Sequence, residues 1–228
     1  MMTRAPFLAA DLAELDERLF SKAQAVVAME TVCTLGPDET TLVALRHDID
    51  HKLEPALAFA RWEAERGYRS TYLPLHTAPY WNEGGLPDAI AELLELGHEI
   101  GIHNNAISEH VRTGRDPHEI LDEAIARLTQ LGATVKGTVA HGDRLCHQQN
   151  FINDEIFEEC VRNGAVPVER KSLASHGLDY DANWLRRGYY ASDSAGVLQG
   201  ATDQVPDHDF SGQLHLLLHP CWWEGAFS

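Results

Sequence analysis

Basic residues are scarce in this sequence, and their scarcity excludes one class of function. Lysine and arginine together number 18, against 35 aspartates and glutamates, which gives a net charge of -17. A protein that binds the phosphate backbone of nucleic acid needs clustered lysine and arginine. We therefore expect no nucleic-acid partner.

Cysteine is scarce as well. The four cysteines lie far apart and form no CxxC pair. This spacing argues against a disulfide framework and against a zinc ribbon, and it suits free thiols in a reducing compartment.

Long apolar runs are missing too. No stretch approaches the roughly 18 consecutive apolar residues of a membrane-spanning helix. Charged residues are spread through positions 1–30, so no apolar signal-peptide core is present there. We expect a cytoplasmic protein without a membrane partner. Because no break in composition divides the 228 residues, we expect a single domain over 1–228.

Segments with strand patterns alternate along the chain with segments of helical periodicity. The expected strands are 40–50, 68–75, 98–103, 134–142, 165–169, 188–192 and 213–219. The expected helices are 11–29, 54–67, 86–97, 116–132 and 153–164. Such alternation is typical of parallel βαβ units, which predicts an α/β sheet or barrel. The first helix, within 1–30, is expected to pack on that core.

Charge appears inside the first strand pattern, where a core is expected. The run "RHDID" places Arg46, Asp48 and Asp50 on one face of the strand. Neighbouring carboxylates are costly unless a cation compensates them. This face is therefore either an ion-pair cluster or a metal-assisted site.

Other titratable residues lie where further strands are expected to end. These residues are His103, His141, Asp193 and His219. A single histidine or aspartate at such a position is usually solvated or caps a turn. In parallel α/β folds, however, the carboxyl ends of the strands meet at one rim. Oxygen and nitrogen ligands at that rim suit Zn²⁺ first, with Co²⁺, Ni²⁺, Mn²⁺ or Fe²⁺ as alternatives.

These motifs together resemble a known family. The segment "LRHDIDHKLEPALAFARWEAERGYRSTYLPL", followed by "LGHEIGIH", "AHGDRL", "YYASDSAG" and "LLLHP", is similar to the polysaccharide deacetylase superfamily (carbohydrate esterase family 4). The likeness is greatest to its intracellular, O-antigen-cluster-like branch, and it spans roughly 42–222. It implies a distorted (β/α) barrel of about seven mainly parallel strands.

The resemblance also implies roles for individual residues. Asp48 matches the general base, and Asp50 and His103 match metal ligands. Arg46 would tune the base, with Arg144 as a second arginine near the site. His219 matches the general acid, with Asp193 as its partner.

The sequence departs from the family pattern at one position. The family has a second histidine four residues after the first, and here position 107 is isoleucine. Two histidines are candidates for the third metal ligand. We favour His141, because a strand end is held more rigidly than the segment that carries the alternative, His110.

The function implied is a metal-dependent deacetylase, which hydrolyses a linear amide and removes an N-acyl group, most simply acetyl, from a sugar or activated sugar of surface-polysaccharide biosynthesis. One alternative is a non-catalytic carbohydrate-binding protein of the same fold. A more distant alternative is an HD-type metal phosphohydrolase, because His47 and Asp48 spell its signature pair. That pair belongs on a helix, whereas here it is expected on a strand.

The remaining polar and aromatic residues suggest ordinary structural roles. Helical glutamates such as Glu63 are expected on solvated faces, and the tryptophans mostly in the core. Five histidines are expected to be exposed in loops or at helix starts: His76, His118, His147, His176 and His208. Cys146 follows the "HGDRL" segment without any sign of a lowered thiol pKa.

Overall fold

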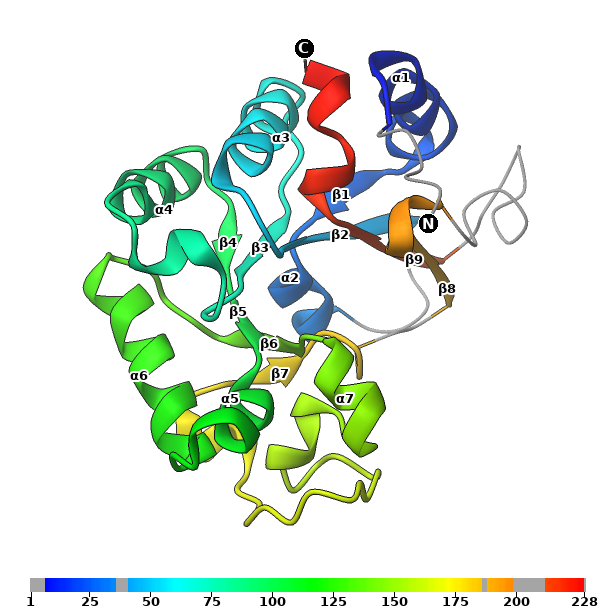
Figure 1. The fold of residues 1–228 in the computed structure, drawn as a ribbon. Coiled ribbons are helices and arrows are strands. Elements are labelled where there is room, and N and C mark those ends of the chain that lie inside the picture. Colours follow the sequence, from blue (N-terminus) through cyan, green and yellow to red (C-terminus); the bar gives the residue numbers. More distant parts are fainter. Residues whose placement is uncertain (1–6, 36–40, 186–187, 199–211, 228) are drawn as a thin grey trace.

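Two parallel β-sheets form the centre of the protein (Figure 1). The computed structural model describes residues 7–35, 41–185, 188–198 and 212–227. Its strands are β1 (Ala25–Val27), β2 (Leu42–Ile49), β3 (Thr71–Pro74), β4 (Glu99–Ile100), β5 (Ile102–Asn104), β6 (Gly137–Ala140), β7 (Tyr180–Asp181), β8 (Tyr189–Ser192) and β9 (Gln213–Leu218). Every strand pair is parallel, as the alternation of strand and helix patterns predicts.

The larger sheet has six strands in the order β4-β3-β2-β9-β8, with β1 also paired to β2. Strand β2 lies at its centre, and all eight of its residues are buried. A strand covered on both faces needs an almost continuous apolar sequence, which Leu42–Leu45 supplies. The charged residues Arg46 and Asp48 follow in the half of β2 nearer its carboxyl end.

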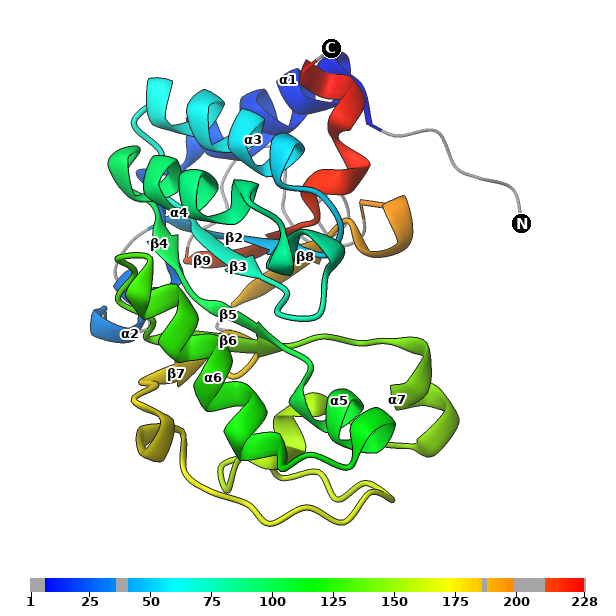
Figure 2. The ribbon, with the colours of Figure 1, turned by 60° about the vertical axis from the view of Figure 1, so that its left-hand side comes forward.

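The smaller sheet has the order β5-β6-β7 and adjoins the larger one at Gly101 (Figure 2). Gly101 is the single residue between β4 and β5, and Leu75 makes an isolated parallel bridge to His103 across the junction. A side chain at Gly101 would begin 2.8 Å from the carbonyl oxygen of Gly137. Only glycine fits this approach without displacing backbone.

Helices pack around the sheets. They are α1 (Ala9–Arg18), α2 (Met29–Thr34), α3 (Leu53–Glu65), α4 (Gly85–Glu95), α5 (Ala106–Thr113), α6 (Pro117–Gln130) and α7 (Arg144–Gln149). Helix α3 packs against the outer face of β2, and α2 packs against the face that carries Ala44. Short 3₁₀ helices complete the chain: η1 (Phe20–Lys22), η2 (Pro79–Asn82), η3 (Asn153–Ile156), η4 (Leu173–His176), η5 (Ser194–Gly196), η6 (Pro220–Trp222) and η7 (Glu224–Phe227). Helix α6 begins at a Pro117 whose preceding Asp116 accepts hydrogen bonds from two backbone amides, as expected for a capped helix start.

The α/β class is confirmed, but the described strands form two sheets, and none of them pairs β7 with β8 to close a ring. The single helix expected over 11–29 is wrong, because α1 ends at Arg18 and the chain then forms η1 and β1. The expected helix 153–164 is limited to the single turn η3, and 165–169 is not a strand. None of the helices in the described part of the chain has the length and apolar character needed to cross a membrane.

Candidate metal centre and its surroundings

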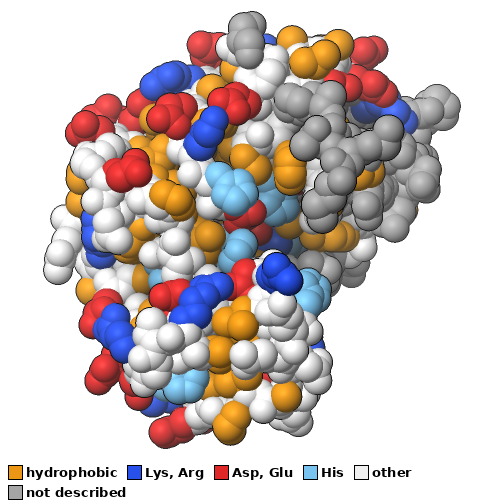
Figure 3. Space-filling model, in the orientation of Figure 1, with side chains coloured by type: hydrophobic (Ala, Val, Ile, Leu, Met, Phe, Trp, Pro, Cys, Tyr) orange, Lys and Arg blue, Asp and Glu red, His pale blue; other side chains and the backbone are white. Residues whose placement is uncertain are grey.

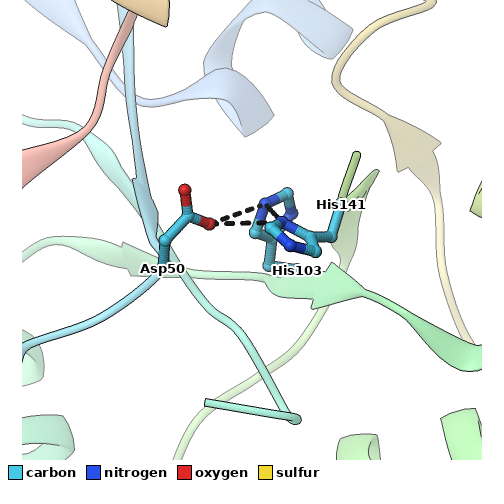
Figure 4. Close-up of side chains that lie close together, drawn as sticks. All are labelled: Asp50, His103 and His141. Carbon is cyan, nitrogen blue, oxygen red and sulfur yellow. Dashed lines mark hydrogen bonds and ion pairs between the residues drawn. The ribbon is translucent and has the colours of Figure 1, made fainter. Parts of the chain in front are cut away.

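Three of the expected residues converge at the carboxyl ends of the strands (Figure 4). Asp50 directly follows β2, His103 lies in β5, and His141 directly follows β6. The Oδ1 atom of Asp50 is 3.3 Å from Nε2 of His103 and 3.3 Å from Nδ1 of His141. The two ring nitrogens are 3.2 Å apart. One ligand atom from each residue can therefore contact a single ion.

Hydrogen bonding fixes the state of the central histidine. The Nδ1 atom of His103 donates to the carbonyl oxygen of Val139 at 3.0 Å, so the neutral ring presents a lone pair at Nε2. That lone pair faces a nitrogen of His141 and an oxygen of Asp50 that has no hydrogen-bond partner among the described residues. Three electron-rich atoms this close require a cation or a shared proton between them.

The electrostatics of the group agree with its geometry. Burial opposes ionisation of Asp50, but the two neighbouring imidazoles outweigh it and hold the pKa of the carboxyl far below its usual range. Burial likewise lowers the pKa of His103, but the charges of Asp48 and Asp50 raise it overall. The site therefore keeps its carboxylate charged and attracts positive charge. One carboxylate and two imidazoles fit a borderline divalent ion such as Zn²⁺, although the residues alone do not select the metal.

Asp48 lies between this group and an arginine. One of its oxygens, Oδ2, is 3.8 Å from Nε2 of His103, and the other, Oδ1, is 3.5 Å from Nε of Arg46. Both Asp48 and Arg46 are buried. The sequence prediction that they share a face of β2 is confirmed, because His47 on the opposite face contacts helix α3 instead.

A second pair of acids lies behind the arginine. The Nη2 atom of Arg46 donates a hydrogen bond to the side chain of Asn183 at 3.3 Å. The positive charge of Arg46 also acts on Asp154 and Asp181, where it favours the ionised form of each carboxyl. Burial raises the pKa of both acids, and the adjacent charge of Asp181 helps to raise the pKa of Asp154 well above its ordinary value. Arg46 is therefore close both to this acid pair and to Asp48. Neither Asp154 nor Asp181 was expected from the sequence.

His219 enters from the other side of the metal group. It follows β9, and its Nε2 atom is 3.9 Å from Oδ2 of Asp50. Its Nδ1 atom donates to Asp193 at 2.6 Å, and the indole of Trp223 donates to the same carboxylate at 2.7 Å. Burial lowers the pKa of His219, but the hydrogen bond and charge of Asp193 outweigh burial and raise the pKa to about 9. The predicted pairing of His219 with Asp193 is confirmed.

The alternative third ligand lies elsewhere. His110 is on α5 and shares a 2.7 Å hydrogen bond with the carbonyl oxygen of Arg115. It does not belong to the Asp50 group, whereas His141 does. Ile107, at the position of the family's second histidine, is fully buried in the hydrophobic core. Arg144 is exposed on α7, so Arg46 is the arginine that contacts Asp48.

One residue that the sequence did not single out supports His141. Asn153 of η3 is fully buried, and its Nδ2 atom donates to the carbonyl oxygen of His141 at 2.8 Å and to Asn105 at 3.0 Å. Its Oδ1 atom accepts from the backbone amide of Ser108 at 3.0 Å. Asn153 therefore connects the chain around His141 to the start of α5. Its only local signal is its place at the start of the expected helix 153–164.

Several residues assigned to exposed positions are buried. Glu63 is fully buried and accepts hydrogen bonds from His47, Ser70 and Tyr72 at 2.6, 2.6 and 2.9 Å. Burial raises the pKa of Glu63, but His47 and the other donors outweigh it and lower the pKa overall. Because His47 serves this network and lies on a strand, the pair His47-Asp48 does not have the helical geometry of an HD-type site.

Of the histidines outside the metal group that the sequence predicts to be exposed, most of those described are buried. The exposure expected for His147 is confirmed, while His76, His118 and His176 are buried. The ring of His118 shares a 3.0 Å hydrogen bond with the ring of His176, which in turn contacts Asp122 at 2.5 Å. His208 lies outside the described residues.

The metal group opens to solvent at the centre of one face. Figure 3 shows histidine and acidic surfaces side by side there, bordered by both basic and hydrophobic surfaces. The side chains of Asp50, His141 and His219 retain exposures of 16, 19 and 14%, enough to reach an incoming molecule, whereas His103 and Asp48 lie deeper.

Comparisons with known proteins do not assign the chain to a family. No protein-family model matches the sequence, and no curated protein matches it significantly.

Proposed function

We propose that the protein is a metal-dependent hydrolase that removes an N-acyl group, most simply acetyl, from a sugar or activated sugar used in surface-polysaccharide biosynthesis. The observation that carries this proposal is the placement of a carboxylate and an imidazole around one candidate metal group. Asp48 lies 3.8 Å from His103, and His219 lies 3.9 Å from Asp50. Amide hydrolysis needs such a base for water and such an acid for the departing amine.

Asp50, His103 and His141 would hold the ion, with Zn²⁺ as the first choice and Co²⁺, Ni²⁺, Mn²⁺ or Fe²⁺ as alternatives. A divalent ion at such a site supplies Lewis acidity, which lowers the pKa of water and polarises an acyl carbonyl. Three protein ligands leave room for a reacting molecule, as catalytic centres require. The hydrogen bond from His103 to Val139 orients one of these ligands.

Asp48 acts as the general base in this proposal. Its Oδ2 atom is 3.8 Å from Nε2 of His103, while the guanidinium of Arg46 places a positive charge 3.5 Å from Oδ1. The charge of Arg46 also acts on the acids Asp154 and Asp181 on its other side. Asp48 takes the proton of water as the water attacks the acyl carbon.

His219 acts as the general acid. Asp193 binds its Nδ1–H, so the proton available for transfer is on Nε2, which points toward Asp50. The imidazolium form is favoured by the same carboxylate. His219 gives its proton to the amine nitrogen as the carbon–nitrogen bond breaks, a step typically worth about 10²- to 10⁴-fold in rate.

The choice of a sugar substrate rests on the sequence resemblance to polysaccharide deacetylases. The distorted barrel of about seven strands belongs to the same proposal, in which the adjoining sheets are two parts of that barrel. The motifs that carry the resemblance are the segments that supply Asp48, Asp50, His103, Asp193 and His219.

The test combines turnover with metal analysis. Purified protein is assayed for release of acetate or formate from a panel of N-acyl sugars and nucleotide-linked N-acyl sugars, with and without Zn²⁺ or Co²⁺. We expect metal-dependent release, and we expect Asp48→Asn to abolish it while leaving the bound metal unchanged. Full activity of Asp48→Asn would remove Asp48 from the mechanism.

A non-catalytic carbohydrate-binding protein is the second candidate, and the buried Ile107 in place of a ligand favours it. Metal content separates the two. A catalytic centre with three ligands should bind about one equivalent of metal. Failure to bind metal on reconstitution would support the non-catalytic candidate.

A further inference from the structure

Two buried histidines outside the metal group share a hydrogen bond. His118 lies in the first turn of α6, and His176 lies at the end of η4. The Nδ1 atom of His118 is 3.0 Å from Nε2 of His176, and the two ring planes are inclined by only 11°. Their exposed fractions are 3 and 8%. Polar atoms this deeply buried must find their hydrogen-bond partners within the protein.

The outer nitrogens of the two rings also have partners. The Nε2 atom of His118 is 3.0 Å from the carbonyl oxygen of Glu169, and Nδ1 of His176 is 2.5 Å from the exposed carboxylate of Asp122. Both partners are acceptors, so both outer nitrogens carry hydrogen. Without another proton, two lone pairs would face each other between the rings. One shared proton removes this repulsion and gives the pair a single positive charge next to Asp122.

This histidine pair joins α6 to the segment 157–177. Within the described part of the chain, every hydrogen bond between that helix and that segment involves His118 or Asp122. Phe157, at the start of the segment, packs edge-on against His176 with the ring centres 6.0 Å apart. The segment contains no helix or strand other than the single turn η4. The histidine pair is therefore its fixed point on α6.

The same segment supports the metal centre at its other end. The backbone amide of Lys171, two residues after Glu169, donates to the carbonyl oxygen of Ile156 at 3.1 Å, at the end of η3. The first residue of η3 is Asn153, which donates to the carbonyl oxygen of His141. A contiguous chain of hydrogen bonds and short backbone links thus connects the histidine pair to a candidate metal ligand.

Further acid would break the contact between the two rings. A second proton on the pair leaves N–H facing N–H, with two positive charges and no acceptor between them. Burial lowers the pKa of His118 below its usual 6.5, and the charges of Lys171 and His176 lower it further, against the carbonyl oxygen of Glu169 and the charge of Asp116. A released His118 takes up a proton more readily than the held one. Release is therefore favoured as the pH falls below about 6.5.

We propose that His118 and His176 form an acid-released clamp, which holds the segment 157–177 on α6 while the pair carries one positive charge and thereby positions the metal ligand His141. When a second proton binds, the segment leaves α6, Asn153 loses its fixed place and the metal site weakens. Both histidines are positioning residues, since neither belongs to the metal group. This regulation concerns metal binding, so it does not depend on the deacylation proposed above.

Two substitutions of His118 separate the clamp from its titration. His118→Gln supplies an amide that can donate to Glu169 and accept from His176 but does not titrate, whereas His118→Ala removes both bonds. Glu119→Gln is the control on the same helix, because the exposed Glu119 side chain makes no hydrogen bond or ion pair among the described residues. Melting temperature at pH 7.5 checks that each variant is folded.

The first measurement is amide hydrogen exchange of the metal-free protein between pH 7.5 and 4.5, corrected for the intrinsic rate, with β2 as the internal reference. In the wild type and in Glu119→Gln, we expect exchange of 157–172 to quicken below pH 6.5 by up to about tenfold per pH unit. It should stay constant in His118→Gln and be fast at every pH in His118→Ala. No acid response in the wild type, or an equal response in His118→Gln, would overturn the clamp.

The second measurement is Zn²⁺ affinity at pH 7.5, by competition with a chromogenic chelator. His118→Ala should bind about tenfold more weakly, as expected for support from outside the ligand set, while His118→Gln and Glu119→Gln stay within twofold of the wild type. An unchanged affinity of His118→Ala would refute the link to His141. If the wild type binds two equivalents of metal and His118→Ala loses one of them, an ion and not a proton joins the rings, and the clamp is wrong.

Discussion

Asp193 binds His219 at both its ring and its backbone. One carboxylate accepts from Nδ1 at 2.6 Å and from the His219 backbone amide at 2.8 Å, and Trp223 donates to it from the indole. This arrangement fixes the direction of the His219 ring as well as its charge. A residue held in this way is suited to transfer a proton along one direction.

Replacement of Asp193 by asparagine should therefore reduce turnover without emptying the metal site. The imidazole loses its charged partner, so its protonated form becomes less populated and its orientation less fixed. We expect kcat to fall about 10²-fold or more. Steady-state kinetics and metal analysis measure the two effects, with Asp179→Asn on the surface as the control. A kcat within twofold of wild type would exclude His219 and Asp193 as an acid pair.

The two candidate third ligands make opposite predictions. His141→Ala removes a nitrogen that faces His103 at 3.2 Å, whereas His110→Ala removes a side chain that contacts only the carbonyl oxygen of Arg115 among the described residues. We expect metal affinity to fall by more than about 100-fold in the first variant, since even outer contacts to ligands are worth 10- to 100-fold. Competition with a chromogenic chelator measures this. Equal affinities would refute the assignment of His141.

Asn153→Ala should weaken metal binding from outside the ligand set. The variant loses the hydrogen bond to the carbonyl oxygen of His141, so the third ligand is held less firmly. We expect a loss of about 10- to 100-fold in affinity. Gln148→Ala, on the exposed side of α7, is the control. If Asn153→Ala lowers the melting temperature but leaves the metal affinity within twofold, Asn153 supports the fold alone.

Glu63 should make stability depend on acid pH. Its pKa is lowered in the folded protein, so its contribution to the free energy of unfolding is complete above the unfolded value of about 4.3. The contribution is lost as the pH falls through the lower folded value. Chemical denaturation between pH 3 and 6 should give a shallower pH dependence for Glu63→Gln, by at most ~1.4 kcal/mol per pH unit. Identical slopes for Glu63→Gln and the exposed control Glu65→Gln would contradict this.

The sequence predicted the strands of the larger sheet best, because local pattern determines them. An apolar run such as Leu42–Leu45 is stable only when it is buried inside a sheet. The alternation of side chains along the strand then places Arg46 and Asp48 on one face. The position of the metal group followed from the rule that parallel strands end at one rim. The grouping of Asp50, His103 and His141 could therefore be predicted from their positions in the chain, whereas the family resemblance supplied the metal-ligand roles expected for Asp50 and His103.

The sequence predictions that proved wrong concern residues whose surroundings are determined by contacts between distant segments. Glu63 looks like a surface residue within its helix, and only the approach of His47 and Tyr72 makes its burial favourable. The segment 153–169 has a helical pattern at first, but the side chain of Asn153 bonds to two other parts of the chain, at the start of α5 and at His141, and Pro167 removes a backbone donor. Such partners leave no trace in a single sequence.

The junction at Gly101 has a mechanical consequence. Asp50 follows a strand of the larger sheet, whereas His103 lies in the smaller sheet and His141 follows one of its strands, and the single residue Gly101 links β4 to β5. An ion held by all three side chains would cross-link the two halves of the molecule. Treatment with a chelator should then quicken amide hydrogen exchange along Ile102–Asn104 more than at the centre of β2, so a bound ion would also stabilise the junction between the two sheets.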